Sequence, residues 1–263
     1  MCRLIGYVGK TIQLNDLLCK PKHSLVVQSY QPQEMKSAVL NADGFGIGWH
    51  HPEREDLPYT YKNVLPIWSD PNLPQIARYI ETDCFLGYVR SATAGLPVDI
   101  TNCQPFSDRK LLFLHNGYIN NFRTTLYRPI RNFLSDSAYQ SIQGNTDSEH
   151  IWAMILSYME NHPETDLADA LNEILTKLSN LTDIHETYFS ANTIISDGDR
   201  LIASRYSYQE SNPTLYWIKN ASAYPDAVII ASEPMFEGNW ESCPENSIIT
   251  VEKNLEVRIN PVS

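Results

Sequence analysis

The order of secondary-structure patterns along the chain constrains the fold more than any other sequence feature. Apolar runs of strand length alternate with loops in the first half, at 2–8, 45–50, 85–92 and 110–117. Two long amphipathic helical patterns follow, at 147–161 and 166–181. Strand-like runs then return, at 193–196, 201–206, 215–219, 227–233, 247–252 and 255–259. Strands on both sides of a helical middle predict an α+β fold, in which packed sheets share a core and are covered by helices.

Local signals place several element ends. T-D-S-E at 146–149 has the capping-box pattern, with Thr146 as the cap and Glu149 reaching back to the helix start. Apolar residues at 73, 76, 77 and 80 predict a short amphipathic helix over 73–81. The D-G-D between two apolar runs, at 197–199, predicts a hairpin. The stretch 50–74, with prolines at 52, 58, 66 and 71, is expected to be a long surface excursion.

Composition excludes several classes of protein. The 263 residues include 20 Lys and Arg against 31 Asp and Glu, a net charge of −11 with no basic run, which argues against nucleic acid and anionic membranes as partners. No apolar segment reaches the roughly 18 residues of a membrane span, and the N-terminus lacks a signal peptide. The five cysteines are odd in number and widely spaced, so a disulfide framework or structural zinc site is not expected. We therefore expect a cytoplasmic protein with free thiols, and a single domain over 1–263.

Cys2 is the first candidate for chemistry. If Met1 is removed, Cys2 becomes the N-terminal residue and carries a thiol beside a free α-amine. An α-amine has a pKa of about 7.7–8.0, so it can accept a proton near neutral pH and activate a neighbouring nucleophile. The alternative is an incidental cysteine at a frayed end. The apolar run C-R-L-I-G-Y-V argues against that alternative, because a buried strand would fix the thiol.

Two charged residues are candidates for binding a substrate. Arg90 lies at the end of an apolar strand in G-Y-V-R-S-A-T-A-G, where its guanidinium could hold a carboxylate by two parallel hydrogen bonds or simply lie on the surface. Ser91 and Thr93 could add hydroxyl donors or begin a turn. Asp147 at the start of the predicted helix could hold a substrate ammonium, or act only as a favourable helix-start residue.

The pair Asn116-Gly117 follows an apolar strand and has two interpretations. Asn-Gly is the strongest short signal for a type I′ hairpin turn. Alternatively, the asparagine amide and the glycine N–H form an oxyanion hole, and the glycine lets the substrate approach the backbone closely. His115 is expected to have a structural role supporting this segment.

Glycines alternate at 44, 46 and 48 in N-A-D-G-F-G-I-G-W. This spacing is neither G-x-G-x-x-G nor a P-loop, so nucleotide binding is not indicated. Alternating glycines in a strand predict that another segment packs closely on that face, and the segment carrying Cys2 is one candidate.

Taken together, these residues predict one chemistry. An arginine and an aspartate can hold the carboxylate and the ammonium of an α-amino acid. A terminal thiol with its own base can then attack a carbonyl further along the side chain, next to an oxyanion hole. The predicted reaction is acyl transfer from a glutamine-like γ-amide.

The motifs M-C-R-L-I-G, N-A-D-G-F-G-I-G-W, V-R-S-A-T-A-G, H-N-G-Y-I-N-N-F and G-N-T-D-S-E occur in this order over about residues 1–150. In this the chain resembles the class II glutamine amidotransferases, which are N-terminal-nucleophile hydrolases. The resemblance implies an αββα sandwich, with two antiparallel sheets between helix layers, and no metal or organic cofactor. It implies Cys2 as nucleophile and Asn116 with Gly117 as the oxyanion hole. Arg90 and Thr93 would hold the substrate α-carboxylate, and Asp147 its α-ammonium.

Within the family, the chain looks most like the stand-alone amidohydrolase of ergothioneine biosynthesis, which releases glutamate from γ-glutamyl-hercynylcysteine sulfoxide. The sequence ends at 263 without a synthase domain, and A-S-E-P at 231–234 and N-S-I-I-T-V at 246–251 also resemble that enzyme. Three alternatives are a γ-glutamyl hydrolase subunit of glutathione degradation, a glutaminase that supplies ammonia to a partner synthase, and a non-catalytic binding protein. A small γ-glutamyl compound is the expected partner, and a homo-oligomer is left open.

Overall fold

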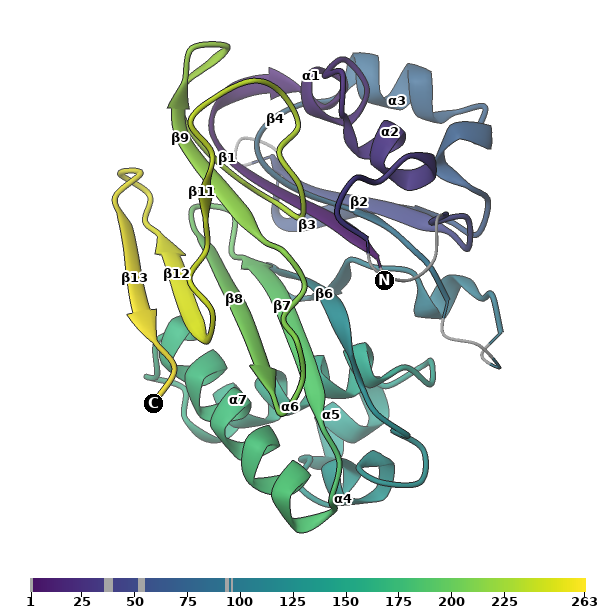
Figure 1. The fold of residues 1–263 in the computed structure, drawn as a ribbon, viewed down its shortest axis with the longest axis vertical. Helices are drawn as coiled ribbons and strands as arrows, with labels where there is room; N and C mark the ends of the chain where they lie inside the picture. The colour runs from purple at the N-terminus through teal and green to yellow at the C-terminus, as the bar shows by residue number, and fades with distance from the viewer. Residues whose placement is uncertain (1, 36–39, 52–54, 93–94, 96) are drawn as a thin grey trace.

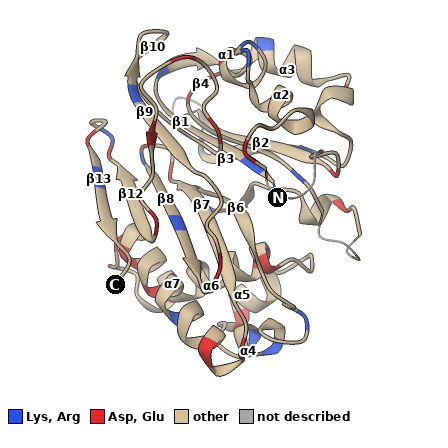
Figure 2. Cartoon of the chain, in the orientation of Figure 1, with Lys and Arg blue, Asp and Glu red and all other residues tan. Residues whose placement is uncertain are grey.

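The computed structural model describes residues 2–35, 40–51, 55–92, 95 and 97–263. Two antiparallel sheets lie face to face, with helices on both outer sides (Figure 1). This arrangement confirms the predicted α+β fold and its four αββα layers. Figure 2 shows that the charged residues are scattered over many elements, and that much of the length of the strands is free of them.

The first sheet has seven strands, and β1 and β4 lie near its centre. From edge to edge its strands are β11 (Glu241–Ser242), β9 (Tyr216–Ala221), β10 (Tyr224–Ala231), β1 (Arg3–Gln13), β4 (Glu81–Val89), β2 (Phe45–His51) and β3 (Glu55–Asn63). The second sheet has six strands, in the order β13 (Val257–Pro261), β12 (Ser247–Val251), β8 (Leu201–Tyr208), β7 (Phe189–Ser196), β6 (Leu111–Ile119) and β5 (Phe106–Asp108).

The helices form the two outer layers (Figure 1). The first sheet is covered by α1 (Leu14–Leu18), α2 (Leu25–Tyr30) and α3 (Leu73–Tyr79). The second is covered by α4 (Tyr127–Arg131), α5 (Asp136–Ser141), α6 (Asp147–Asn161) and α7 (Leu167–Ile184). Two short 3₁₀ helices, η1 (Ile67–Ser69) and η2 (Ile100–Asn102), lie in connections.

Three apolar clusters fill the three spaces between these layers. Successive residues of a strand point to opposite faces, so Leu4 of β1 packs between the sheets while Ile5 packs against α1 and α2. On β6, Leu114 likewise faces the first sheet and Phe113 faces α6. The central strands are buried on both faces, which explains why they read as continuous apolar runs in the sequence.

Two local predictions need correction. Thr146 caps α6 as expected, since its Oγ1 accepts a hydrogen bond from the N–H of Glu149 at 3.3 Å. The Glu149 carboxylate, however, accepts the N–H groups of Gln143 (2.9 Å) and Gly144 (2.7 Å), because the preceding turn brings them to the helix start. The expected excursion over 50–74 contains the strand β3. Among the described residues it pairs only with β2, and an edge strand tolerates Pro58, which has no N–H to donate.

Candidate active site

Cys2 immediately precedes β1, and its thiol is held by the neighbouring strand. The Cys2 Sγ lies 2.8 Å from the Tyr88 hydroxyl and 3.4 Å from the backbone N of Ser91. The register between β1 and β4 pairs Leu4 with Tyr88, so the end of β4 runs alongside Cys2. Cys2 is partly exposed, and these two contacts hold its thiol in position.

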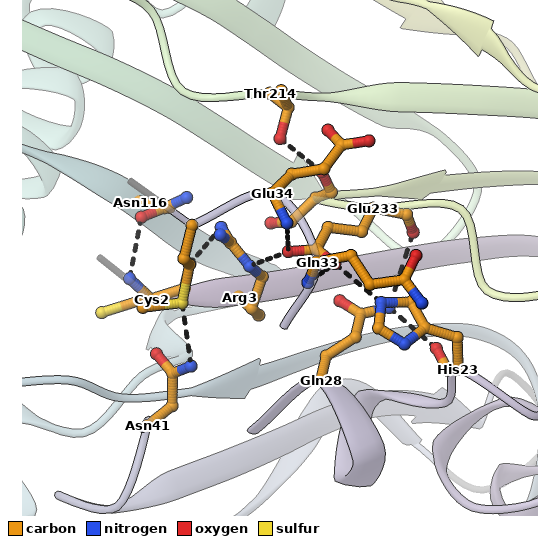
Figure 3. Close-up of polar contacts among 12 residues, drawn as sticks. Cys2, Arg3, His23, Gln28, Gln33, Glu34, Asn41, Asn116, Thr214 and Glu233 are labelled. Atoms are coloured by element: carbon orange, nitrogen blue, oxygen red, sulfur yellow. Dashed lines mark hydrogen bonds and ion pairs between the residues drawn. The ribbon is translucent and has the colours of Figure 1, made fainter. Parts of the chain in front are cut away.

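Asn116 of β6 accepts the hydrogen bond of the Cys2 backbone N–H. The N–H of Cys2 donates to Asn116 Oδ1 at 3.0 Å (Figure 3). The Asn116 side chain is 1% exposed, and among the described residues its Nδ2 has no hydrogen-bond partner. A buried donor without an acceptor is costly, so this NH₂ group is suited to binding an oxygen of a ligand next to the thiol.

Gly117 and His115 form the structural support of this segment. A Cβ on Gly117 would overlap the carbonyl oxygen of Ser190 and lie 2.6 Å from His115 Nε2, so only glycine fits there. His115 Nε2 donates to that carbonyl at 3.2 Å, and its Nδ1 accepts from the Ser148 hydroxyl at 2.8 Å. Burial lowers the pKa of His115, which keeps the ring neutral in these two bonds.

Asn116 and Gly117 lie inside β6, where they pair with Asn192 and Ala191 of β7. The hairpin-turn interpretation of Asn-Gly is therefore wrong. Pairing with a neighbouring strand outweighs the local preference of these two residues for a turn.

Arg90 is buried directly after β4, with 3% of its surface exposed, so it is not a surface residue. Its Nη1 donates to the backbone oxygen of Asp43 at 3.3 Å. The Asp43 carboxylate also accepts a hydrogen bond from the N–H of Ala92 at 2.8 Å. Backbone hydrogen bonds join Arg90 to Asp43 and Gly44. The segment before β2 therefore holds Arg90 next to Ser91, which contacts the thiol. Thr93 lies outside the described residues.

Asp147 is the first residue of α6, and its carboxylate is fixed at the end of β6. It accepts hydrogen bonds from the N–H of Ile119 at 2.8 Å and from that of Ser148 at 2.7 Å. Ile119 is three residues beyond Asn116 on the same strand. The structure therefore brings Cys2 and Asn116 into direct contact. Asp147 is bonded to β6, the strand of Asn116, and Arg90 follows β4, the strand next to Cys2.

A buried ionic network that the motif-by-motif reading missed lies behind Cys2 (Figure 3). Arg3 donates from Nη1 to the Cys2 carbonyl at 2.9 Å, and its Nε lies 2.8 Å from Glu233 Oε1. His23 donates to Glu233 Oε2 at 2.7 Å, and the backbone N–H groups of Gln33 and Glu34 donate to the same carboxylate. Glu233 belongs to the A-S-E-P run at 231–234, which supports the family resemblance but does not by itself indicate what Glu233 does.

The charges in this network stabilise one another. Burial alone would raise the pKa of the Glu233 carboxyl, but its hydrogen bonds and the Arg3 charge hold that pKa below its usual range. Burial lowers the pKa of Arg3, and the Glu233 charge opposes this effect. The neighbouring Ser232 accepts the N–H of Leu4 on its hydroxyl at 3.0 Å. The A-S-E-P run therefore fixes the first residues of β1.

The glycines at 44, 46 and 48 do allow close packing, but the neighbouring segment is not the one that carries Cys2. A Cβ on Gly46 would overlap the carbonyl oxygen of Gln104, and one on Gly44 would lie 2.6 Å from Cys103 Sγ. The segment at 103–105 therefore occupies this face of β2. The sequence predicts the close approach but contains no signal for the partner.

All five cysteines are unpaired. Among the described residues, no three His, Cys, Asp or Glu side chains are grouped so as to hold a metal ion. No helix in the described part of the chain is both long enough and apolar enough to cross a membrane.

Comparisons of the whole sequence identify similar proteins. Residues 11–230 match the family model described as class-II glutamine amidotransferases. The chain is 30% identical over 304 residues to the probable glutamine amidotransferase DUG3 of Saccharomyces cerevisiae, covering 100% of this chain and 84% of the yeast protein. It is 28% identical over 263 residues to the gamma-glutamyl-hercynylcysteine sulfoxide hydrolase of Mycolicibacterium smegmatis, covering 100% of both.

Solved structures share the fold. A glutamine aminotransferase class-II domain protein of Silicibacter pomeroyi superimposes with a TM-score of 0.73 at 24% identity, over 100% of both chains. Glutamine phosphoribosylpyrophosphate amidotransferase of B. subtilis superimposes with a TM-score of 0.68 at 15% identity, over 100% of this chain and 49% of that one.

Proposed function

Because the chain belongs to the class-II glutamine amidotransferase family and is an amide-bond hydrolase, we propose that it cleaves a γ-glutamyl amide through a thioester on Cys2. One observation carries this proposal. Asn116 Oδ1 is occupied by the N–H of Cys2, so its buried Nδ2, which has no partner in the described part of the chain, is available next to Cys2. A donor in that position stabilises the oxyanion that forms when a thiol attacks a carbonyl.

The first half of the reaction forms the thioester. After removal of Met1, the neutral α-amine of Cys2 donates one hydrogen to Asn116 and uses its lone pair to accept the thiol proton. The Sγ attacks the γ-carbonyl carbon, and Asn116 Nδ2 with the Gly117 N–H stabilises the resulting oxyanion. The protonated amine then gives its proton to the leaving nitrogen, the C–N bond breaks, and the γ-glutamyl group stays on sulfur.

The second half releases glutamate. Water gives a proton to the Cys2 amine and attacks the thioester carbonyl at the same oxyanion site, and the thiol departs with that proton. Arg90, together with Thr93, binds the substrate α-carboxylate, and the fixed carboxylate of Asp147 binds its α-ammonium. The reaction needs no metal or organic cofactor.

We propose γ-glutamyl-hercynylcysteine sulfoxide as the substrate, with a role in ergothioneine biosynthesis in the cytoplasm. The mycobacterial relatives named gamma-glutamyl-hercynylcysteine sulfoxide hydrolase support the proposal, since one aligns over the full length of both chains. The chain would act as one domain over 1–263. Glutathione is the alternative substrate, and ammonia supply to a partner synthase is the alternative activity.

A substrate panel tests this proposal. Glutamate release is measured with γ-glutamyl-hercynylcysteine sulfoxide, glutathione and glutamine, for the parent chain and for Cys2→Ala. We expect kcat/KM for the first substrate to exceed the others by at least about tenfold, and Cys2→Ala to be inactive. A preference for glutathione or glutamine would assign the corresponding alternative. Unchanged turnover by Cys2→Ala would overturn the mechanism itself.

A further inference from the structure

We propose that Tyr88 is a further catalytic residue, whose hydroxyl donates a hydrogen bond to the Cys2 sulfur and stabilises the attacking thiolate. The two atoms are 2.8 Å apart. The inference rests on the proposed function in one respect, which is that Cys2 is the nucleophile. It adds a group that contacts the reacting sulfur itself, whereas the proposed oxyanion donors bind the carbonyl oxygen of the substrate.

The position of Tyr88 in the fold fixes its hydroxyl. Tyr88 is the second-last residue of β4 and pairs with Leu4 of β1. Its side chain is 3% exposed and belongs to the apolar cluster between the two sheets, with Leu86 and Leu114. The ring is therefore held within this cluster, and its hydroxyl contacts the Cys2 sulfur.

The hydroxyl acts as a donor in this contact. Burial raises the pKa of Tyr88 well above its usual value, and the nearby Cys2 raises it further, so the phenol keeps its proton at neutral and alkaline pH. The sulfur is the only acceptor identified for that proton among the described residues. The Ser91 N–H, 3.4 Å from the sulfur, is a second donor.

Other titratable groups surround this pair. Arg90 follows β4 and Cys103 follows η2, and both interact electrostatically with Tyr88. Arg3 on β1 interacts with Cys2 and donates to its carbonyl. Among the described residues, only Tyr88 and Ser91 donate directly to the sulfur.

A hydrogen bond to the sulfur has two opposing effects on reactivity. It stabilises the thiolate relative to the thiol. It also makes each thiolate a weaker nucleophile, with a Brønsted slope of about 0.4–0.5. Removing the hydroxyl should therefore move the pH profile of thiol reactivity upward and raise its high-pH plateau. A change that merely loosened the structure would not produce this combination.

The test is the alkylation of Cys2 by iodoacetamide as a function of pH, followed on the Cys2 peptide by mass spectrometry. In Tyr88→Phe, the midpoint of the profile should rise by about one pH unit. The plateau rate should increase about threefold. Tyr206→Phe is the matched control, because Tyr206 is also buried and its hydroxyl bonds Ser179 at 2.7 Å in a different cluster. Its profile should equal that of the parent.

A second variant keeps the test valid if Tyr88→Phe fails to fold. Incorporation of 3-fluorotyrosine at position 88 keeps the hydroxyl and makes it a stronger donor, so the midpoint should fall. A profile that coincides with the parent in either Tyr88 variant, or an equal shift in Tyr206→Phe, would overturn the inference. Alkylation needs no γ-glutamyl substrate, so its outcome is independent of whether the substrate panel supports hydrolysis.

Discussion

The carboxylate of Glu233 lies 2.8 Å from the guanidinium Nε of Arg3, and both side chains are only 1% exposed. The same guanidinium donates to the carbonyl of Cys2. This buried ion pair therefore connects the end of β10 to the residue that carries the proposed nucleophile. Removing one partner of such a pair leaves an uncompensated charge in the interior.

Glu233→Gln should lower the free energy of unfolding by about 3–5 kcal/mol, because the change preserves shape but leaves the Arg3 charge buried without its counter-ion. Urea unfolding measures this loss. Lys10→Met is the control, since it breaks the Lys10–Asp226 pair, whose side chains are 66% and 62% exposed. That change should cost less than about 1 kcal/mol. If both variants lost the same free energy of unfolding, the buried pair would not stabilise the fold more than an exposed one.

The stability of the protein should fall as the pH drops below about 6.5. Burial lowers the pKa of His50 to about 4, although Asp197 opposes the shift. As the pH falls, His50 is therefore protonated in the unfolded chain before it is protonated in the folded one. At pH 5 this difference should have lowered the free energy of unfolding by about 2 kcal/mol. Urea unfolding of His50→Gln at pH 7 and pH 5 should show a smaller drop than the parent. His185→Gln, at an exposed histidine, should behave as the parent, and a drop unaffected by His50→Gln would refute this origin.

Asn116→Asp should lower kcat by about 10²–10³-fold, with a smaller effect on KM. The variant keeps an oxygen for the Cys2 N–H but replaces the Nδ2 donor by an oxygen that cannot donate. Steady-state release of glutamate measures both constants. Asn246→Asp makes the same chemical change where Asn246 Oδ1 accepts the N–H of Ser207 in the second sheet, and should leave kcat unaltered. An Asn116→Asp enzyme with the parent kcat would exclude Asn116 from the oxyanion hole.

Asp147→Asn should raise KM for γ-glutamyl substrates by about 10–100-fold, because a charge-assisted contact to the substrate ammonium is worth about 1.5–3 kcal/mol. The neutral side chain can still accept one of the two N–H groups that hold the carboxylate. Asp136→Asn at the start of α5 is the control for loss of a helix-start charge. If both variants show the parent KM, Asp147 acts only at the start of its helix.

Much of the layered fold follows from local signals in the sequence. The apolar runs that became β1, β4 and β6 are buried on both faces, and α6 begins where Thr146 predicts. One exception is the stretch 50–74, where prolines suggest a loop although an edge strand needs hydrogen bonds on one side only.

The site itself could be predicted only in part. Cys2 and Asn116 stand in distinctive motifs, and the structure brings them into contact. Tyr88 and Glu233 also stand in the motifs G-Y-V-R-S-A-T-A-G and A-S-E-P, but these motifs do not indicate their contacts, which depend on β1 lying between β10 and β4. Ser232 and Leu4, for example, are hydrogen-bonded partners 228 residues apart. Such pairings are set by sheet order rather than by any local pattern.

The central claim is that Cys2, exposed by loss of Met1, carries the γ-glutamyl group as a thioester. The most direct test is mass spectrometry of the enzyme quenched in acid during turnover of a γ-glutamyl substrate. We predict a chain without Met1 whose mass increases by one γ-glutamyl group, with the addition mapping to the Cys2 peptide and absent from Cys2→Ala. Turnover by a chain that retains Met1, or an adduct on any other residue, would contradict the claim.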